Sequence, residues 1–181
     1  QLDAEMGPIV SKAAQDRITG YIGIGEQEGA KLVVDGRKFQ GAMAGAGCDN
    51  GFWVGGTLFD HVTPDMRIYK EEIFGPVISI MRTATLDDAL AIENNNPYGN
   101  AASVFTENGG AARKVMEKAG AGMIGVNIGV PVPREPFSFG GWNESKFGVG
   151  DITGKSSIEF WTEMKKITTK WESAARTNWM S

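Results

Sequence analysis

The first part of the chain alternates short apolar runs with glycine-rich breaks. Pro8 is a suitable first helical residue, and apolar positions through Ile22 recur at helical spacing, which predicts an amphipathic helix of roughly four turns. We expect the glycines from Gly23 to Gly29 to end this helix. Lys31 to Val34 then predicts a strand, which the turn residues Asp35 and Gly36 close.

From Val77 onward, continuous apolar runs alternate with helical patterns. The order is strand, helix, strand, helix, strand, with the strands at 77–81, 101–106 and 123–128. Short apolar runs of this kind are typical of buried strands. Their spacing favours a parallel sheet with right-handed crossovers, so the sequence predicts an α/β fold.

Capping residues predict where the two intervening helices begin. Thr85 is a plausible N-cap, and Asp88 three residues later completes a pair that resembles a capping box. Asn108, or the glycines after it, should begin the second helix. Its inward face is expected to consist of Ala112, Val115, Met116 and Ala119.

The pattern changes toward the C-terminus. Residues 137–150 are rich in glycine and aromatic residues and predict a loop. Residues 157–171 alternate apolar and polar side chains, which predicts one long extended arm. A terminal strand exposes unpaired backbone unless it pairs with something, so we expect either an internal edge strand or pairing across a subunit interface.

Composition narrows the range of partners. The chain has 181 residues, a hydrophobic content of 41% that can fill a core, and a net charge of −4. This charge argues against non-specific nucleic-acid binding, and no apolar run approaches the roughly 20 residues that span a bilayer. The single cysteine excludes an intramolecular disulfide, so a reducing compartment is expected: the cytoplasm, or the mitochondrial matrix in a eukaryote.

The residues alone give no complete catalytic centre. Cys48 lies in a glycine-rich loop beside Asp49, whose negative charge disfavours a reactive thiolate, and the only histidine, His61, lies in a later turn. The chain has no recognisable zinc, phosphate-loop or esterase motif. We therefore expect no metal site and no self-sufficient active site.

The segment Glu71-Glu72-Ile73-Phe74-Gly75-Pro76 is the most distinctive polar feature. Two adjacent carboxylates precede an apolar pair, and Gly75-Pro76 then resets the backbone. We predict that the carboxylates lie at a strand-to-strand junction and point away from the core. From the residues alone, both a solvated surface and a functional site remain open.

Several segments, in the same order, resemble the C-terminal part of the aldehyde dehydrogenase superfamily. Glu71 to Pro76 is similar to the most characteristic sequence of that part, and residues 97–106 and 121–127 resemble its later strand segments. Three further segments are most like the CoA-acylating methylmalonate-semialdehyde dehydrogenases: 127–133, 137–141 and 160–171. Residues 146–151 differ from the usual Arg-Gly-Asp sequence of that subfamily, and Gly56 stands where a proline is usual.

The resemblance implies an incomplete three-layer α/β/α catalytic domain over residues 1–150 and an oligomerisation arm and tail over residues 151–181. It implies NAD as cofactor, with Glu72 on the ribose hydroxyls beside the nicotinamide, Phe74 near that ring, and Glu71 in a structural role. The family's nucleophilic cysteine would lie upstream of Gln1, and Cys48 does not match its motif. No catalytic residue is therefore expected in this chain, which alone should be inactive.

The enzyme implied by the resemblance oxidises malonate or methylmalonate semialdehyde with NAD. Coenzyme A, the co-substrate, releases the thioester as acetyl-CoA or propionyl-CoA with loss of carbon dioxide. A homodimer or homotetramer formed through the arm is expected. Two alternatives stay open: an NAD(P)-dependent aldehyde dehydrogenase that releases a free acid, and a non-catalytic binding or assembly module of the same fold.

Overall fold

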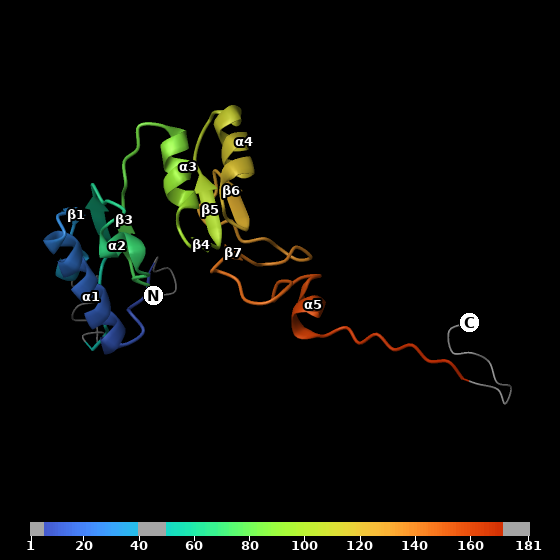
Figure 1. Ribbon diagram of the computed structural model, residues 1–181. Coiled ribbons are helices and arrows are strands. Elements are labelled where there is room, and N and C mark those ends of the chain that lie inside the picture. The colour runs from blue at the N-terminus through green and yellow to red at the C-terminus, as the bar shows by residue number, and fades with distance from the viewer. Residues whose placement is uncertain (1–5, 40–49, 172–181) are drawn as a thin grey trace. The chain divides into compact units, whose positions relative to one another are not determined.

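The computed structural model describes residues 6–39 and 50–171 (Figure 1). The chain divides into two compact units, Gln1–Asp88 and Ala89–Ser181. In the described residues the strands form separate sheets, with one three-stranded sheet before residue 88 and two two-stranded sheets after it. The division at residue 150 between a catalytic domain and an arm remains a prediction.

In the first unit, a three-stranded sheet packs with a long helix. The strands are β1 (Lys31–Val34), β2 (Thr57–Asp60) and β3 (Val77–Ser79), and their order in the sheet is β1-β2-β3. β1 pairs antiparallel with β2, whereas β2 and β3 are parallel. The helix α1 (Lys12–Gln27) buries Ile18 and Ile22 completely in the same core as Phe59 of β2. A short 3-10 helix, η1 (Gly36–Lys38), follows β1.

The helix α1 begins later than the sequence predicts. Its N-cap is Ser11, whose hydroxyl accepts a hydrogen bond from the backbone N–H of Ala14 at 3.2 Å. Pro8 is therefore not the first helical residue. Ile9 donates its backbone N–H to the carbonyl of Phe52 at 2.8 Å, and this bridge keeps the preceding segment out of the helix.

The expectation that the glycines after Ile22 end the helix is wrong for Gly23 and Gly25 and confirmed for Gly29, which follows the C-cap Glu28 and donates its N–H to the carbonyl of Glu26 at 3.1 Å. Gly23 and Gly25 lie inside α1, which continues to Gln27. Gly25 is buried, and a Cβ placed there would lie 2.9 Å from the ring of Phe59, so this glycine permits close packing of the helix on β2. Gly29, with φ of +93°, lies beyond the helix end.

The strand expected at 77–81 is shorter and less buried than predicted. β3 ends at Ser79, and the side chain of Ile78 is 63% exposed. Among the described residues of the first unit, β3 pairs with β2 alone and lies at the edge of this sheet.

The second unit contains a parallel strand–helix–strand arrangement, as expected. β5 (Ala101–Val104) and β6 (Met123–Val126) are parallel neighbours, and α4 (Gly109–Lys118) connects them. The short strands β4 (Tyr98–Gly99) and β7 (Trp142–Asn143) form a separate antiparallel pair. The predicted loop at 137–150 therefore contributes a strand.

Both predicted helix caps are confirmed. The hydroxyl of Thr85 accepts from the N–H of Asp88 at 3.1 Å and donates to its carboxylate at 2.7 Å, directly before α3 (Leu86–Asn94). The Asn108 side chain accepts from two backbone N–H groups at the start of α4. In α4 the inward face is smaller than expected, because Met116 is 50% exposed whereas Ala112, Val115 and Ala119 are buried.

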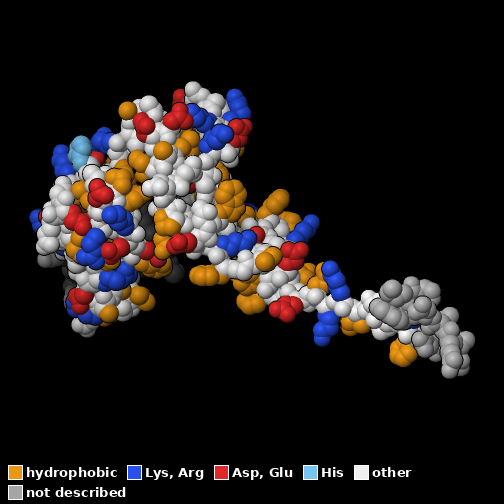
Figure 2. Space-filling view, in the orientation of Figure 1, with side chains coloured by type: hydrophobic (Ala, Val, Ile, Leu, Met, Phe, Trp, Pro, Cys, Tyr) orange, Lys and Arg blue, Asp and Glu red, His pale blue; other side chains and the backbone are white. Residues whose placement is uncertain are grey.

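The predicted single extended arm at 157–171 is wrong in its first part. Residues Ser157–Trp161 form a helix, α5, in which the rings of Phe160 and Trp161 meet edge to face at 4.9 Å. Residues 162–171 follow without helix or strand (Figure 1). All of them are exposed. Both hydrophobic and basic side chains lie along this segment (Figure 2), and the large hydrophobic residues Met164, Ile167 and Trp171 are exposed.

Candidate functional site

The segment Glu71–Pro76 lies between a short helix and a strand. α2 (Arg67–Lys70) precedes it, and β3 begins directly after it. The expected strand-to-strand junction is therefore corrected to a helix-to-strand junction. The backbone of Glu71 caps α2, since its N–H donates to the carbonyl of Arg67 at 2.8 Å.

Glu71 is held by its neighbours on α1 and α2. The Arg67 guanidinium donates two hydrogen bonds to its carboxylate, at 2.8 and 3.0 Å, and the hydroxyl of Tyr21 donates to the same group. Arg67 also lies 5.5 Å from the centre of the Tyr21 ring. These hydrogen bonds, first from Arg67 and then from Tyr21, lower the pKa of Glu71 to about 2. Such contacts fit the structural role expected for Glu71.

Glu72 and Phe74, the two predicted cofactor-binding residues, point away from the core. Glu72 is exposed, and its carboxylate forms no hydrogen bond or ion pair with another described residue. Phe74 is 80% exposed and has a φ of +55°, which bulky residues rarely adopt. Between them, Ile73 is only 8% exposed and belongs to the core.

The backbone of this turn is fixed to α1. The guanidinium of Arg17 donates to the carbonyl of Ile73 and, at 3.5 Å, to that of Glu72. Gly75 lies so close to Ile18 that a Cβ at this position would be 2.6 Å from two of its side-chain atoms. The side chains of Glu72 and Phe74 thus point outward and that of Ile73 points inward, and α1 holds the backbone between them in place.

This arrangement fits the cofactor role that was predicted from the sequence. The free carboxylate of Glu72 can accept hydrogen bonds from two vicinal ribose hydroxyls. Two positions later, the exposed ring of Phe74 offers a flat apolar surface. Sequence reasoning did not identify Tyr21 and Arg17. The spacing of Arg67 and Glu71, four apart, was a signal for their ion pair, but nothing local relates Tyr21 to a residue fifty positions later.

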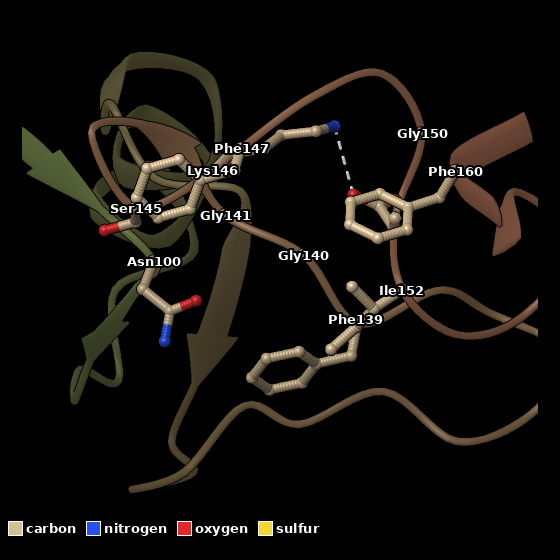
Figure 3. A pocket seen from close by; sticks show the side chains of 11 residues that line it. Asn100, Phe139, Gly140, Gly141, Ser145, Lys146, Phe147, Gly150, Ile152 and Phe160 are labelled. Atoms are coloured by element: carbon tan, nitrogen blue, oxygen red, sulfur yellow. Dashed lines mark ion pairs between the residues drawn. The ribbon is translucent and has the colours of Figure 1, made fainter.

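The second unit holds a cavity of about 210 Å³ lined by aromatic, glycine and polar residues (Figure 3). Its polar groups are partly paired with each other: the Lys146 ammonium lies 3.1 Å from the Asp151 carboxylate, an ion pair drawn as a dashed line in Figure 3. Ser145 accepts a hydrogen bond from the N–H of Gly99 at 3.2 Å. Phe139 lines the cavity, whereas Trp142 lies outside it in β7.

The other sequence candidates contribute little to a site. Cys48 lies outside the described residues. His61 follows Asp60, whose carboxylate accepts two hydrogen bonds from Arg82 at 2.9 and 2.7 Å. In residues 6–39 and 50–171, no group of three or more His, Cys, Asp or Glu side chains is arranged to hold a metal ion. No helix in this part of the chain has the length and apolar character needed to cross a membrane.

Comparison with known proteins gives consistent matches. A malonate-semialdehyde dehydrogenase from Pseudomonas aeruginosa is 48% identical over 171 residues, which are 94% of this chain and 34% of that protein. A Sinorhizobium meliloti crystal structure with NAD, provisionally named a methylmalonate-semialdehyde dehydrogenase, is 48% identical with a TM-score of 0.83, covering 94% of this chain and 34% of that one. A Mycobacterium tuberculosis aldehyde dehydrogenase in complex with NAD+ is 36% identical with a TM-score of 0.76, covering 88% and 31%.

These relatives are longer proteins, and this chain spans about a third of their length. Their structural similarity confirms the α/β fold of aldehyde dehydrogenases that the sequence resemblance implied. The model of the aldehyde dehydrogenase family matches residues 1–167, which include the Glu72–Phe74 turn and both compact units almost completely. The chain belongs to the aldehyde dehydrogenase family.

Proposed function

We propose that this chain is the cofactor-positioning part of an NAD-dependent, CoA-acylating malonate- or methylmalonate-semialdehyde dehydrogenase. The observation that carries the proposal is the 48% identity to a malonate-semialdehyde dehydrogenase over nearly the whole chain. The free carboxylate of Glu72 and the exposed ring of Phe74 support it, because they offer a diol acceptor and an apolar surface on one turn. The reactive cysteine would come from a part of the protein outside this sequence.

The chain's own residues would act on the nicotinamide half of the cofactor. NAD, when bound, supplies the hydride acceptor. Glu72 would accept hydrogen bonds from the two ribose hydroxyls and thereby fix the rotation of the attached ring. Phe74 would cover one side of that ring and limit the access of water to it. Both residues would position the cofactor, so this chain would orient the nicotinamide ring and would not supply the nucleophile.

The reaction that we propose consumes coenzyme A. Malonate semialdehyde, NAD+ and coenzyme A would give acetyl-CoA, carbon dioxide and NADH; the methylmalonate compound would give propionyl-CoA. The aldehyde carbon, bound to the reactive cysteine, would be oxidised as hydride passes to NAD+. The bond to the carboxylate would break with release of carbon dioxide, and the α-carbon would take up the proton that the coenzyme A thiol gives up. The coenzyme A sulfur would replace the cysteine sulfur in the thioester. Release of a free acid would instead need water as the acceptor.

The test is the dependence of the full-length protein on coenzyme A. With malonate semialdehyde and NAD+, we expect NADH and acetyl-CoA to form in equal amounts only when coenzyme A is present. Equal rates of NADH formation without coenzyme A, with a free acid as the product, would show a hydrolytic aldehyde dehydrogenase. No NADH formation with any aldehyde would favour the non-catalytic module. The 181-residue chain alone should show no turnover.

We also propose that the protein is a homo-oligomer that uses the segment after α5. The large hydrophobic side chains of this segment are exposed in the single chain, and such surface is typical of protein–protein contacts. A second copy of the chain is the partner that fits, since symmetric self-association is the commonest arrangement of soluble oligomers.

A further inference from the structure

The turn Glu71–Gly75 touches one face of α1 at several successive points. Arg17 donates to two carbonyls of the turn, Ile18 packs against Gly75, and Tyr21 donates its hydroxyl to Glu71. Tyr21 lies four positions after Arg17 and three after Ile18, so all three side chains lie on the same side of α1. One face of α1 therefore contacts the turn along its whole length.

Arg67 completes this support from the α2 side. Its side chain forms two hydrogen bonds to the Glu71 carboxylate, and its backbone N–H donates to the carboxylate of Glu28 at 2.8 Å. The guanidinium also lies over the Tyr21 ring. Because Glu71 engages both Arg67 and Tyr21, a cation on α2 is paired with the first carboxylate of the segment, and the second, Glu72, stays free.

The conformation of Phe74 needs such support. Its φ of +55° is sparsely populated for an aromatic residue, and conformations of this kind persist only when their surroundings hold them. The inward contacts of Ile73 and Gly75 fix the backbone on either side of it. The ring can thus remain exposed without the turn collapsing onto the core.

We propose that Tyr21 and Arg67 are positioning residues that act through Glu71 to keep Glu72 free and to hold Glu72 and Phe74 in the orientation that the nicotinamide ribose needs. The inference rests on the proposed role of Glu72 toward NAD. Loss of the Glu71 charge would release Arg67, which is then free to pair with Glu72 and to compete with the cofactor. Loss of the Tyr21 hydroxyl would remove the hydrogen bond from α1 to the Glu71 carboxylate and leave the contacts of Arg17 and Ile18 with the turn in place.

The experiment compares the full-length protein with its Tyr21→Phe, Glu71→Gln, Glu72→Gln and Glu71→Gln/Glu72→Gln variants. For each, the KM for NAD, kcat and the thermal midpoint are measured. We expect Glu71→Gln and Tyr21→Phe to raise the KM for NAD by about 5- to 10-fold, because small displacements of positioning groups can cost up to about 100-fold. In the double variant, the effect of Glu71→Gln on KM should vanish.

Asp60→Asn is the matched control, because it also removes a bidentate arginine pair in the same unit but lies away from the turn in the chain. It should lower the thermal midpoint and leave the KM for NAD unchanged. If Glu72→Gln raises this KM while Tyr21→Phe and Glu71→Gln behave like Asp60→Asn, the positioning inference is wrong and the role of Glu72 stands. If Glu72→Gln itself has no effect, both fail. Tyr21→Phe, which removes one oxygen, keeps the test decisive should Glu71→Gln not fold.

Discussion

At the scale of single residues, Glu71 and Glu72 are chemically alike and differ only in what surrounds them. Glu71 accepts hydrogen bonds from two elements, and its carboxylate stays ionised in all ordinary buffers, since its pKa is lowered to about 2. The Glu72 carboxylate accepts no hydrogen bond from another described residue and forms no ion pair with one. An exposed, unpaired carboxylate on a fixed backbone is available for a ligand.

Replacement of Glu72 by glutamine should weaken use of the cofactor. The variant retains the shape of the side chain but loses the charge-assisted hydrogen bonds, which are worth about 1.5–3 kcal/mol, or about 10- to 150-fold in kcat/KM for NAD. Steady-state kinetics of the full-length protein with varied NAD measure this value. Glu117→Gln, an exposed position on α4, is the control and should leave it unchanged. An unchanged kcat/KM in Glu72→Gln would argue against the proposed site.

The Asp60–Arg82 pair makes stability depend on pH in acid. Hydrogen bonds from Arg82, chiefly, lower the pKa of Asp60 to about 2 from its ordinary 3.8. The pair therefore stabilises the folded state fully above about pH 4, and this contribution is lost as the pH falls toward 2. We expect Asp60→Asn to lower the urea midpoint at pH 7, and the difference from the wild type to shrink below pH 4.

Denaturation by urea, followed by circular dichroism at several pH values, measures that difference. Asp65→Asn serves as the control, because its carboxylate is exposed and forms no ion pair with another described residue. A difference between wild type and Asp60→Asn that stays constant down to pH 2 would contradict the expected coupling.

The features of the site that the sequence predicted are those set by residues close to each other along the chain. The resemblance identified the motif Glu71 to Pro76, and the Gly-Pro break predicted that the side chain of Glu72 points outward. The junction type was not, because α2 is a single turn and short helices carry little periodic signal. Tyr21 was hidden for another reason: its contact with Glu71 joins residues fifty positions apart and depends on how α1 packs.

At the scale of elements, α1 shows how tertiary packing overrides local propensity. Its glycines predicted an early end, since glycine lowers helix stability, yet the helix continues to Gln27. The reason is the contact of Gly25 with Phe59 and Ile68 in the core, which leaves no room for a side chain. The caps at Thr85 and Asn108 were predicted correctly, because capping depends on neighbouring residues alone.

Two glycines of α1 should respond oppositely to alanine. Gly20 is exposed and nothing lies within 4 Å of a Cβ there, so Gly20→Ala should raise the free energy of unfolding by about 0.5–1 kcal/mol. Gly25→Ala should lower it by about 1–3 kcal/mol, because its Cβ would lie 2.9 Å from Phe59 and 3.1 Å from Ile68. Urea titration of both variants and the wild type measures the two changes in the free energy of unfolding. Equal signs would contradict the packing argument.

At the scale of the whole molecule, the parts with local signals were predicted and the long-range relations were not. The parallel β5–α4–β6 arrangement appears where the sequence pattern placed it. The pairing of β2 with β1 on one side and β3 on the other was not predicted, because strand pairing is set by contacts between distant segments. The C-terminal segment likewise departs from its alternating pattern, since residues Ser157–Trp161 form the helix α5.

Removal of the segment after α5 should change the assembly of the protein. Met164, Ile167 and Trp171 are 86%, 74% and 90% exposed in the single chain, and burial against a second copy would remove this apolar surface from water. We expect a full-length protein truncated after Thr162 to have a lower mass by light scattering than the intact protein. Ile167→Asp should have the same effect through one residue, whereas Lys166→Ser, beside it, should not. An unchanged mass in both the truncated protein and Ile167→Asp would show that this segment does not join the subunits.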